Sequence, residues 1–429
     1  MKKIIICLFL TAFIFFSFNL TLKFVSADND YWYRVWGGNG HDEGVGIALD
    51  SSNNIYLGGV LEMFSDPWSH NALCLVKYDN TGNYQWNKTI NGTSYRGGAI
   101  TIDSSDNIFL AGEIYNPNSS TFDFILIKID PSGNYQWNKT WDSGNDDVCY
   151  AIALDSLENI YLAGSSFTEP NNEDFCLVKY DKLGNYQWNR TWGGTYNDRY
   201  TAIALDSLNN VFLGGVTLSF GAGFYDMCLM NFNSTGDFQW YKTWGSPDAD
   251  FCQAIVLDAS ENIYLTGISY SEGYSDFSLI KYDKLGNYQW NRTWGGGNSF
   301  EDCYSMLIDP SENLYLAGTK GDQYCIVVYD TNGTFQWTKS LKIGKGGYAT
   351  GVVRDINGNI YIGGIVFTNT ASANDFLLIK NLHLFPDQQI SGYNIFLLTM
   401  IIGILSFVIL LKTNLLRNKK IKIKKEFKD

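Results

Sequence analysis

The sequence predicts an all-β protein, a seven-bladed β-propeller of four-stranded antiparallel blades. A Gln-Trp pair recurs about every 51 residues, at Trp86, Trp137, Trp188, Trp240, Trp290 and Trp337. A second motif, "ALDSLENIYLAG" at 153–164, has seven versions, and so does a third, "DFCLVKYD" at 174–181. A unit of about 50 residues that occurs seven times is typical of propeller blades.

Each unit is expected to contain four strands, which we name A to D from the ring centre outward. Runs such as "NIYLAG" and "FCLVKY" are rich in β-branched and aromatic residues and are bounded by Asp, Asn and Gly. The segments "DSLEN" and "DKLGN" have turn chemistry, because a leading Asp closes an Asx turn and Gly adopts positive φ. One unit therefore predicts an A–B hairpin followed by a C–D hairpin.

The two ends of the repeat region predict how the ring closes. Residues 31–38, "YWYRVWGG", follow the D-strand pattern but are preceded by no A, B or C strand. The last unit, around 350–380, has A, B and C strands but no D strand. We expect the N-terminal strand to complete this seventh blade, which removes both open sheet edges.

The repeat signature can be written "GG…D…AIALDSxxNIYLAG…DFxLIKYDxxGNYQW", and it covers residues 31–380. It resembles the SBBP family, the seven-bladed β-propeller repeats of bacterial and archaeal surface proteins. The resemblance implies a propeller fold and a location outside the cytoplasm. It implies no reaction.

The chain ends predict a membrane-anchored surface protein. Residues 1–27 have the basic start, apolar core and small-residue cleavage site of a signal peptide, with an uncleaved anchor as the alternative. Residues 28–385 form the propeller ectodomain. Residues 386–411 hold a juxtamembrane segment and a transmembrane helix, and 412–429 form a basic tail that the positive-inside rule places in the cytoplasm. Cleavage of this C-terminal region as a sorting signal is a further alternative.

The charge of the expected ectodomain limits its partners. Residues 28–411 carry 20 basic and 42 acidic side chains, a net charge of −22. Nucleic acid is therefore not expected as a partner, since binding it needs a basic surface. The expected partners are the membrane, through the C-terminal helix, and a glycan or protein ligand outside the cell.

Tryptophans and cysteines both recur in the repeat. The tryptophans of the D strand fit blade-to-blade packing, with a sugar-binding aromatic strip as the alternative. Seven cysteines lie outside the signal region, and equivalent positions in different blades are too far apart to bridge. We interpret them as buried thiols that pack as small apolar residues.

The candidate ligand face is the one formed by the D–A and B–C loops. The A–B and C–D turns are nearly invariant, whereas the B–C loops vary, and binding residues tend to lie on such loops. Trp68, in the longest B–C loop, is a candidate ligand contact. The D–A loops carry acids that we expect to ring the central opening as a Ca²⁺ or cationic-ligand site: Asp42, Asp147, Asp198, Asp250 and Asp302. The alternative is that such an Asp caps its own loop through backbone N–H groups.

Two further sets of residues are weaker candidates. His41 and His70 fall in loops of the same face and could meet around a transition metal together with Asp42, or could simply be exposed. Four sequons share one place on strand D and are candidate glycosylation sites, the alternative being strand sequence copied with the repeat: Asn87, Asn138, Asn189 and Asn291.

The sequence therefore predicts a cell-surface propeller that serves as a binding or adhesion module or an envelope scaffold. No cofactor other than Ca²⁺ is expected. The alternative is a surface hydrolase or lyase with its site at the same loop face. No catalytic residue is singled out, because the sequence contains no G-x-S-x-G, H-E-x-x-H or glycine-rich phosphate motif.

Overall fold

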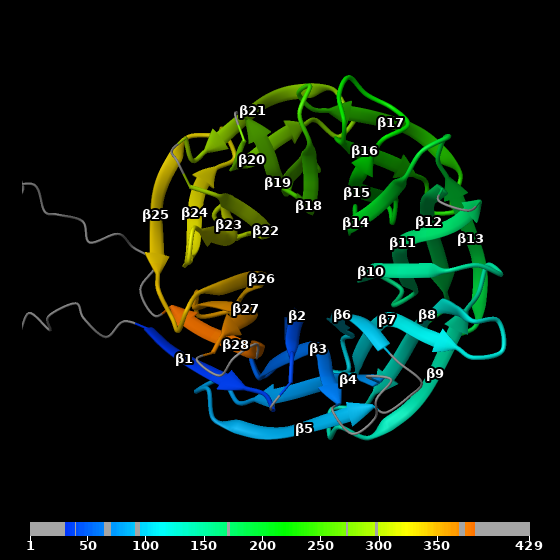
Figure 1. Ribbon diagram of the computed structural model, residues 1–429, viewed down its shortest axis with the longest axis vertical. Coiled ribbons are helices and arrows are strands. Elements are labelled where there is room, and N and C mark those ends of the chain that lie inside the picture. The colour runs from blue at the N-terminus through cyan, green and yellow to red at the C-terminus, as the bar shows by residue number, and fades with distance from the viewer. Residues whose placement is uncertain are drawn as a thin grey trace, which may run out of the picture. The chain divides into compact units, whose positions relative to one another are not determined.

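Seven four-stranded antiparallel sheets surround a central axis in the computed structural model of the chain (Figure 1). The structure describes residues 31–38, 40–63, 70–90, 95–169, 172–271, 273–296, 299–368 and 374–381. The predicted all-β fold, seven blades of four antiparallel strands, is confirmed.

The strands of the first four blades follow one another along the chain. Blade 1 contains β2 (Glu43–Leu49), β3 (Ile55–Met63), β4 (His70–Tyr78) and β5 (Tyr84–Ile90). Blade 2 contains β6 (Tyr95–Ile102), β7 (Ile108–Asn116), β8 (Thr121–Ile129) and β9 (Tyr135–Trp141). Blade 3 contains β10 (Asp147–Leu154), β11 (Ile160–Glu169), β12 (Asn172–Tyr180) and β13 (Tyr186–Trp192). Blade 4 contains β14 (Asp198–Leu205), β15 (Val211–Thr217), β16 (Asp226–Phe232) and β17 (Phe238–Trp244).

The last three blades complete the ring. Blade 5 contains β18 (Asp250–Leu257), β19 (Ile263–Ser271), β20 (Tyr274–Tyr282) and β21 (Tyr288–Trp294). Blade 6 contains β22 (Glu301–Ile308), β23 (Asn313–Lys320), β24 (Gln323–Asp330) and β25 (Phe335–Leu341). Blade 7 contains β26 (Gly347–Arg354), β27 (Ile360–Phe367), β28 (Asn374–Asn381) and β1 (Tyr31–Trp36). The first strand of each blade lies nearest the axis and the last forms the outer rim (Figure 1).

Blade 7 joins the two ends of the described chain, as the sequence predicts. Strand β1 pairs antiparallel with β28, from Tyr31 opposite Asn381 to Trp36 opposite Phe376. Contacts to blade 1 then close the ring, including a hydrogen bond of 2.7 Å from the Thr350 hydroxyl to the Gly44 carbonyl oxygen.

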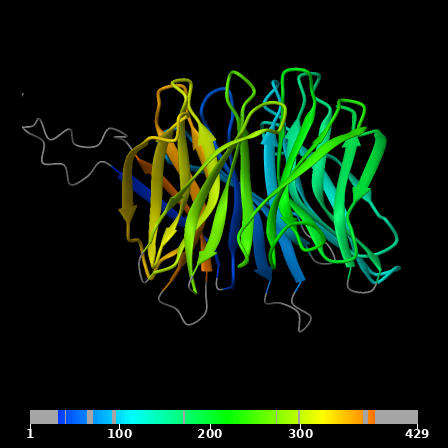
Figure 2. The ribbon, with the colours of Figure 1, turned by 90° about the horizontal axis from the view of Figure 1, so that it is seen from above.

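The strands run between two ends of the ring, which carry different connections (Figure 2). We call the end with the A–B and C–D turns the turn face, and the end with the B–C and D–A loops the loop face. In the A–B turn of blade 3, Asp155 accepts hydrogen bonds from the backbone N–H groups of Leu157 (2.9 Å) and Asn159 (2.8 Å), while Glu158 takes the left-handed conformation with φ 65°. The Asx-turn interpretation is confirmed.

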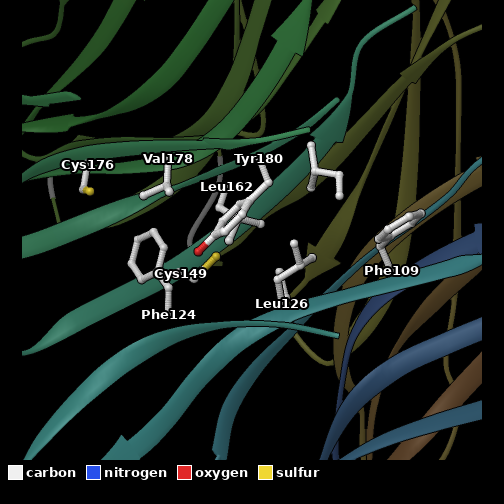
Figure 3. Packing of buried hydrophobic residues seen from close by; sticks show 10 residues of the cluster. Phe109, Phe124, Leu126, Cys149, Leu162, Cys176, Val178 and Tyr180 are labelled. Atoms are coloured by element: carbon white, nitrogen blue, oxygen red, sulfur yellow. The ribbon is translucent and has the colours of Figure 1, made fainter. Parts of the chain in front are cut away.

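The hydrophobic core lies between neighbouring blades. Figure 3 shows Phe124 and Leu126 of blade 2 beside Cys149 of blade 3, and Phe109 and Tyr180 belong to the same cluster. The Gln-Trp tryptophans fill the wider outer spacing, and Trp188 reaches Gly236 in the next blade. The packing interpretation of these tryptophans is confirmed.

The cysteines are part of this core. All seven cysteines outside residues 1–27 are free and buried. This confirms their interpretation as buried thiols.

The predicted signal peptide, transmembrane helix and basic tail lie outside the described residues. Within the part of the chain that the structure describes, no helix is long and apolar enough to cross a membrane.

Candidate paired-carboxylate site

The structure corrects the expected position of the D–A acids. Asp42 is 1% exposed, and Asp147, Asp198 and Asp250 are fully buried where the D–A loop meets the A strand, so they do not ring an open channel mouth. The central cavity has a volume of about 240 Å³ and is lined instead by the middle of the A strands.

These buried acids cap their own loops. Each carboxylate accepts a hydrogen bond from the backbone N–H of the residue four positions earlier, and hydroxyls of Thr217 and Ser269 also donate to Asp198 and Asp250. This is the geometry that the loop-capping alternative describes. The four backbone bonds are Gly38–Asp42 (2.5 Å), Ser143–Asp147 (2.8 Å), Gly194–Asp198 (2.9 Å) and Ser246–Asp250 (2.6 Å).

A second carboxylate, from the start of the preceding blade's C strand, approaches each cap. Between blades 4 and 5, Asp226 Oδ1 and Asp250 Oδ2 converge on Gly245. A Cβ atom at Gly245 would overlap Asp226 Oδ1 and lie 3.1 Å from Asp250 Oδ2. Glycine is therefore required here because the two carboxylates occupy the space of a side chain.

The same arrangement recurs between blades 7 and 1. A Cβ atom at Gly37 would overlap Asp375 Oδ1 and lie 2.8 Å from Asp42 Oδ2. The Asp42 carboxylate also contributes to raising the pKa of Asp375, after burial, which is the larger cause. The pair is therefore a repeated feature of the ring.

Some oxygens of these acids have no donor. Asp226 is 2% exposed, and its Oδ2 accepts the backbone N–H groups of Ala222 (2.7 Å) and Gly223 (3.1 Å). Its Oδ1 is buried and has no hydrogen-bond partner among the described residues, and the same holds for Oε2 of Glu301, which is 1% exposed. Buried acceptors are normally satisfied, so these oxygens call for a ligand or a proton.

Three carboxylates meet between blades 2 and 3. Asp142 directly follows the last residue of its D strand, Trp141, as Gly245 follows Trp244 in blade 4. One carboxylate oxygen from each of Asp123, Asp142 and Asp147 lies within 4.8 Å of the other two. Burial raises the pKa of Asp147 to about 6, and the Asp142 charge adds to the shift. Burial also raises the pKa of Asp123.

At each blade boundary, the C-strand acid and the A-strand acid are either both present or both absent. The strand registers place five C-strand acids at equivalent positions and five A-strand acids at equivalent positions. Each C-strand acid is followed, across one D strand and one D–A loop, by the A-strand acid of the next blade. The two remaining boundaries have neither acid: Ala72 and Tyr95 occupy the two positions between blades 1 and 2, and Gln323 and Gly347 occupy them between blades 6 and 7. We call the five others paired-carboxylate interfaces: Asp375–Asp42, Asp123–Asp147, Asp174–Asp198, Asp226–Asp250 and Asp276–Glu301.

The tryptophan that ends the D strand follows the same distribution. It is present before the D–A loop at all five interfaces, as in Trp36 and Trp192, and is replaced by Ile90 and Leu341 at the other two. Sequence reasoning missed the C-strand acids, although this joint distribution is visible when the seven units are aligned.

Among the other candidate residues, the structure describes the side chains of Asp302 and His41. Asp302 directly follows Glu301 and accepts a hydrogen bond of 3.3 Å from the Tyr304 hydroxyl. His41 is exposed, and its backbone forms a bridge with Asn374. His70 begins β4, but its side chain and all of Trp68 lie outside what the structure describes.

The candidate glycosylation sites all lie on outermost strands, on β5, β9, β13 and β21. The side chains of Asn189 and Asn291 each accept a hydrogen bond of 2.6 Å from the tyrosine three residues earlier, Tyr186 and Tyr288 respectively. The sequons are therefore on the outer rim of the ring.

Comparisons with known proteins agree with this fold. No family model matches the chain. A WD repeat-containing protein of Acanthamoeba polyphaga mimivirus is 24% identical over 198 residues, which is 40% of this chain but only 12% of that protein.

Among solved structures, the Neurospora crassa Pan2 WD40 domain matches 81% of this chain and 90% of its own, with TM-score 0.52 and 10% identity. The Toxoplasma gondii coronin WD40 domain matches 84% and 88%, with TM-score 0.51 and 10% identity. Drosophila Plexin A, in complex with Semaphorin 1b, matches 82% and 86%, with TM-score 0.50 and 8% identity. The chain is thus a seven-bladed β-propeller whose structural neighbours are WD40-like and whose WD-repeat relative is distant.

Proposed function

We propose that the chain is a membrane-anchored surface binding module of the SBBP type, with its ligand site on the loop face. The observation that carries this proposal is where the propeller ends. Strand β28 runs from the loop face to the turn face, so the described chain leaves the ring at Asn381 on the turn face. The apolar segment proposed to span the membrane begins only a few residues later, at 390.

The short connection favours one orientation. Residues 382–389 can span at most about 28 Å when fully extended, because each residue adds roughly 3.3–3.6 Å. The turn face is therefore proposed to lie close to the membrane, and the variable loops to point away from it.

Side chains at the tips of the turns support this orientation. Five large apolar residues are strongly exposed there: Leu157 (66%), Leu183 (68%), Leu208 (71%), Leu285 (67%) and Ile356 (83%). Lys182 and Lys284 precede two of these leucines. Apolar tips next to lysines suit a bilayer interface, where the apolar groups enter the lipid boundary and the ammonium groups meet the headgroups.

The loop face carries the variation that ligand binding needs. The connection between β15 and β16 covers residues 218–225, whereas the one between β23 and β24 is residues 321–322. Aromatic side chains are exposed on this face, among them Tyr196 (63%) and Phe224 (62%). Varied loops on a rigid scaffold are the usual place for a binding surface.

The orientation can be tested with the full-length protein in liposomes. Leu183→Cys and Phe224→Cys would each be labelled with an environment-sensitive fluorophore, since the natural thiols of the propeller are buried. The label at position 183 should be quenched by lipid-attached quenchers and the label at 224 should not. Equal quenching at both positions, or quenching at 224 alone, would contradict the orientation.

The binding role needs a separate test. Full-length protein would be screened against glycans and surface proteins, and any hit tested against a variant whose residues 218–225 are replaced by a short Gly-Ser turn. Binding should fall at least tenfold in that variant and remain in Leu183→Ser on the opposite face. Release of a shortened glycan product would instead favour the hydrolase or lyase alternative.

A further inference from the structure

We propose that the paired-carboxylate interfaces bind a divalent cation, Ca²⁺, between the C-strand acid of one blade and the A-strand acid of the next. These proposed ligands are not the ring of acids around the channel mouth that the sequence predicted. They consist of buried pairs such as Asp226 with Asp250, and of the group Asp123, Asp142 and Asp147, set into the blade boundaries of the loop face.

Charge is the first argument for a cation. Two buried carboxylates at close range cannot both stay ionised without a counter-charge. Among the described residues, no lysine or arginine forms an ion pair with Asp226 or Asp250. The counter-charge between these two acids must therefore come from a bound ion or from a proton. At the Asp276–Glu301 interface, Lys320 lies 3.5 Å from Glu301 and supplies a positive charge, so this interface is left out of the proposal.

The unsatisfied oxygen is the second and independent argument. Asp226 is almost completely buried, and its Oδ1 points to the place beside Gly245 that Asp250 Oδ2 also approaches, yet no donor reaches it within the described residues. Ca²⁺ binds six to eight oxygens in flexible geometry and accepts carboxylates, carbonyls and water together. A cation at this point would use the oxygen that the protein leaves unsatisfied.

The three-carboxylate group distinguishes a cation from a shared proton. One proton can join two carboxylates, as in acid pairs, but Asp123, Asp142 and Asp147 place three carboxylate oxygens within 4.8 Å of one another. A single divalent ion can contact all three. Because this group occupies the position of the pairs, we assign the same ligand to both.

The joint distribution of the acids is the third argument. If each acid served only to cap a loop or end a strand, one could be lost without the other. Both are absent at the same two boundaries and both are present at the other five. A ligand held by both acids explains this, because one carboxylate alone would bind it weakly.

The neighbouring tryptophans provide a direct readout. The D-strand tryptophan lies opposite the residue that follows the C-strand acid, as in the pairs Trp36–Phe376 (ring centroids 5.4 Å apart) and Trp294–Phe277 (5.2 Å). After Asp226 this residue is Met227, opposite Trp244. Terbium(III) takes the same oxygen ligands as Ca²⁺ and is excited by energy transfer from nearby tryptophan. Bound terbium should therefore emit when tryptophan is excited.

The experiment uses the full-length protein in detergent at pH 7.5, after a chelator has removed any bound metal ions. Terbium should give saturable emission that Ca²⁺ displaces at concentrations at least tenfold below those needed for Mg²⁺. Ca²⁺ should also raise the thermal midpoint. The double variant Asp226→Asn and Asp250→Asn keeps the side-chain shape and should lose one equivalent of bound ion.

The matched control is Asp181→Asn together with Asp283→Asn, two exposed turn aspartates on the opposite face. This variant should keep the full number of bound ions. The proposal is overturned if Ca²⁺ neither displaces terbium nor shifts the midpoint, or if the Asp226/Asp250 variant binds as many ions as the parent. A midpoint that rises only on acidification would assign the pairs a shared proton instead.

Discussion

The Tyr324 hydroxyl of blade 6 donates a hydrogen bond of 2.7 Å to the carbonyl oxygen of Ile365 in blade 7. The carbonyl oxygen of Gly346 lies 3.1 Å from the same hydroxyl, and Tyr324 is 2% exposed. This boundary has no carboxylate pair and no tryptophan at the end of its D strand. A buried phenol therefore joins the blades where the repeated motif is missing.

Removing that hydroxyl should weaken the boundary. Tyr324→Phe removes the hydroxyl that donates to the buried Ile365 carbonyl oxygen, whereas the Gly346 carbonyl oxygen keeps the Phe367 N–H as a donor. We expect a loss of about 1–2 kcal/mol in the free energy of unfolding. Tyr186→Phe, which removes an exposed hydroxyl bonded to Asn189, should change it by less than about 0.5 kcal/mol. Urea denaturation of both variants measures the difference. Equal losses would show that the bond to Ile365 contributes nothing specific.

Stability should depend on pH through Asp147. Burial raises the pKa of this carboxyl to about 6 in the folded protein, from an ordinary value of 3.8. The folded state therefore holds the proton more tightly than the unfolded state, and the free energy of unfolding falls as pH rises between these values. With divalent cations removed by a chelator, Asp147→Asn should be more stable than the parent protein at pH 7.5 and similar to it at pH 3.5.

Asp181 should show the opposite sign. Hydrogen bonds, first that from the Asn185 backbone, lower the pKa of this exposed carboxyl, so its contribution is present above the ordinary pKa and is lost on acidification. Asp181→Asn should thus remove stability at pH 7.5. Thermal midpoints measured from pH 3.5 to 7.5 test both pH dependences. If the parent and Asp147→Asn gave parallel profiles, the prediction for Asp147 would be contradicted.

Glycines at positive φ in this ring allow a left-handed backbone, and some also leave room for a neighbouring side chain. Two glycine variants separate these effects. Gly236, in a C–D turn, has φ 83°, and a Cβ atom there would lie 2.9 Å from the indole of Trp188 in the neighbouring blade. Gly144, in a D–A loop, has φ 96°, and a Cβ atom there would meet no atom within 4 Å. Gly144→Ala should cost about 1 kcal/mol from backbone strain alone. Gly236→Ala should cost roughly 1–3 kcal/mol more from overpacking.

Thermal or urea unfolding of the two glycine variants provides the measurement. The comparison holds the positive φ nearly constant and changes only the crowding. Equal destabilisation would mean that Trp188 moves aside without cost and that the blade contact is loose.

The buried thiols should be unreactive toward thiol reagents in the native state. Burial raises the pKa of Cys252 and of Cys303 to about 12, so little thiolate forms at pH 8. A colorimetric thiol reagent should react with none of the propeller cysteines within minutes, and with all seven after denaturation. Reductant should leave the thermal midpoint unchanged. Rapid labelling of the native protein would show that a blade boundary opens.

The sequence predicted the ring because each repeat contains its own strand and turn signals. Asp155 and Gly184 stand where a turn needs them, and "YWYRVW" could only be a D strand without a blade. The geometry of the D–A acids was harder. Asp250 follows a surface loop in sequence, so exposure was expected, but the loop folds its N–H groups over the carboxylate and buries it.

Pairing between Asp226 and Asp250 was not predicted because they belong to different blades and are joined only through packing. A comparison of the seven units shows that they vary together, but not how close they lie. The ligand of the loop face could not be predicted for another reason. That ligand is a proposal about loops that differ between the repeats, and a repeated motif carries no information about what varies from one copy to the next.

The pairing of β1 with β28 also sets the order of events during synthesis. The first strand leaves the ribosome with no partner and must wait until the last strand is made, which at about 5–20 residues per second takes on the order of tens of seconds. During that interval the nascent ring has an open edge, exposed to pairing with another chain. The ring is therefore completed only after the last strand, β28, has been synthesised, which requires the chain up to Asn381.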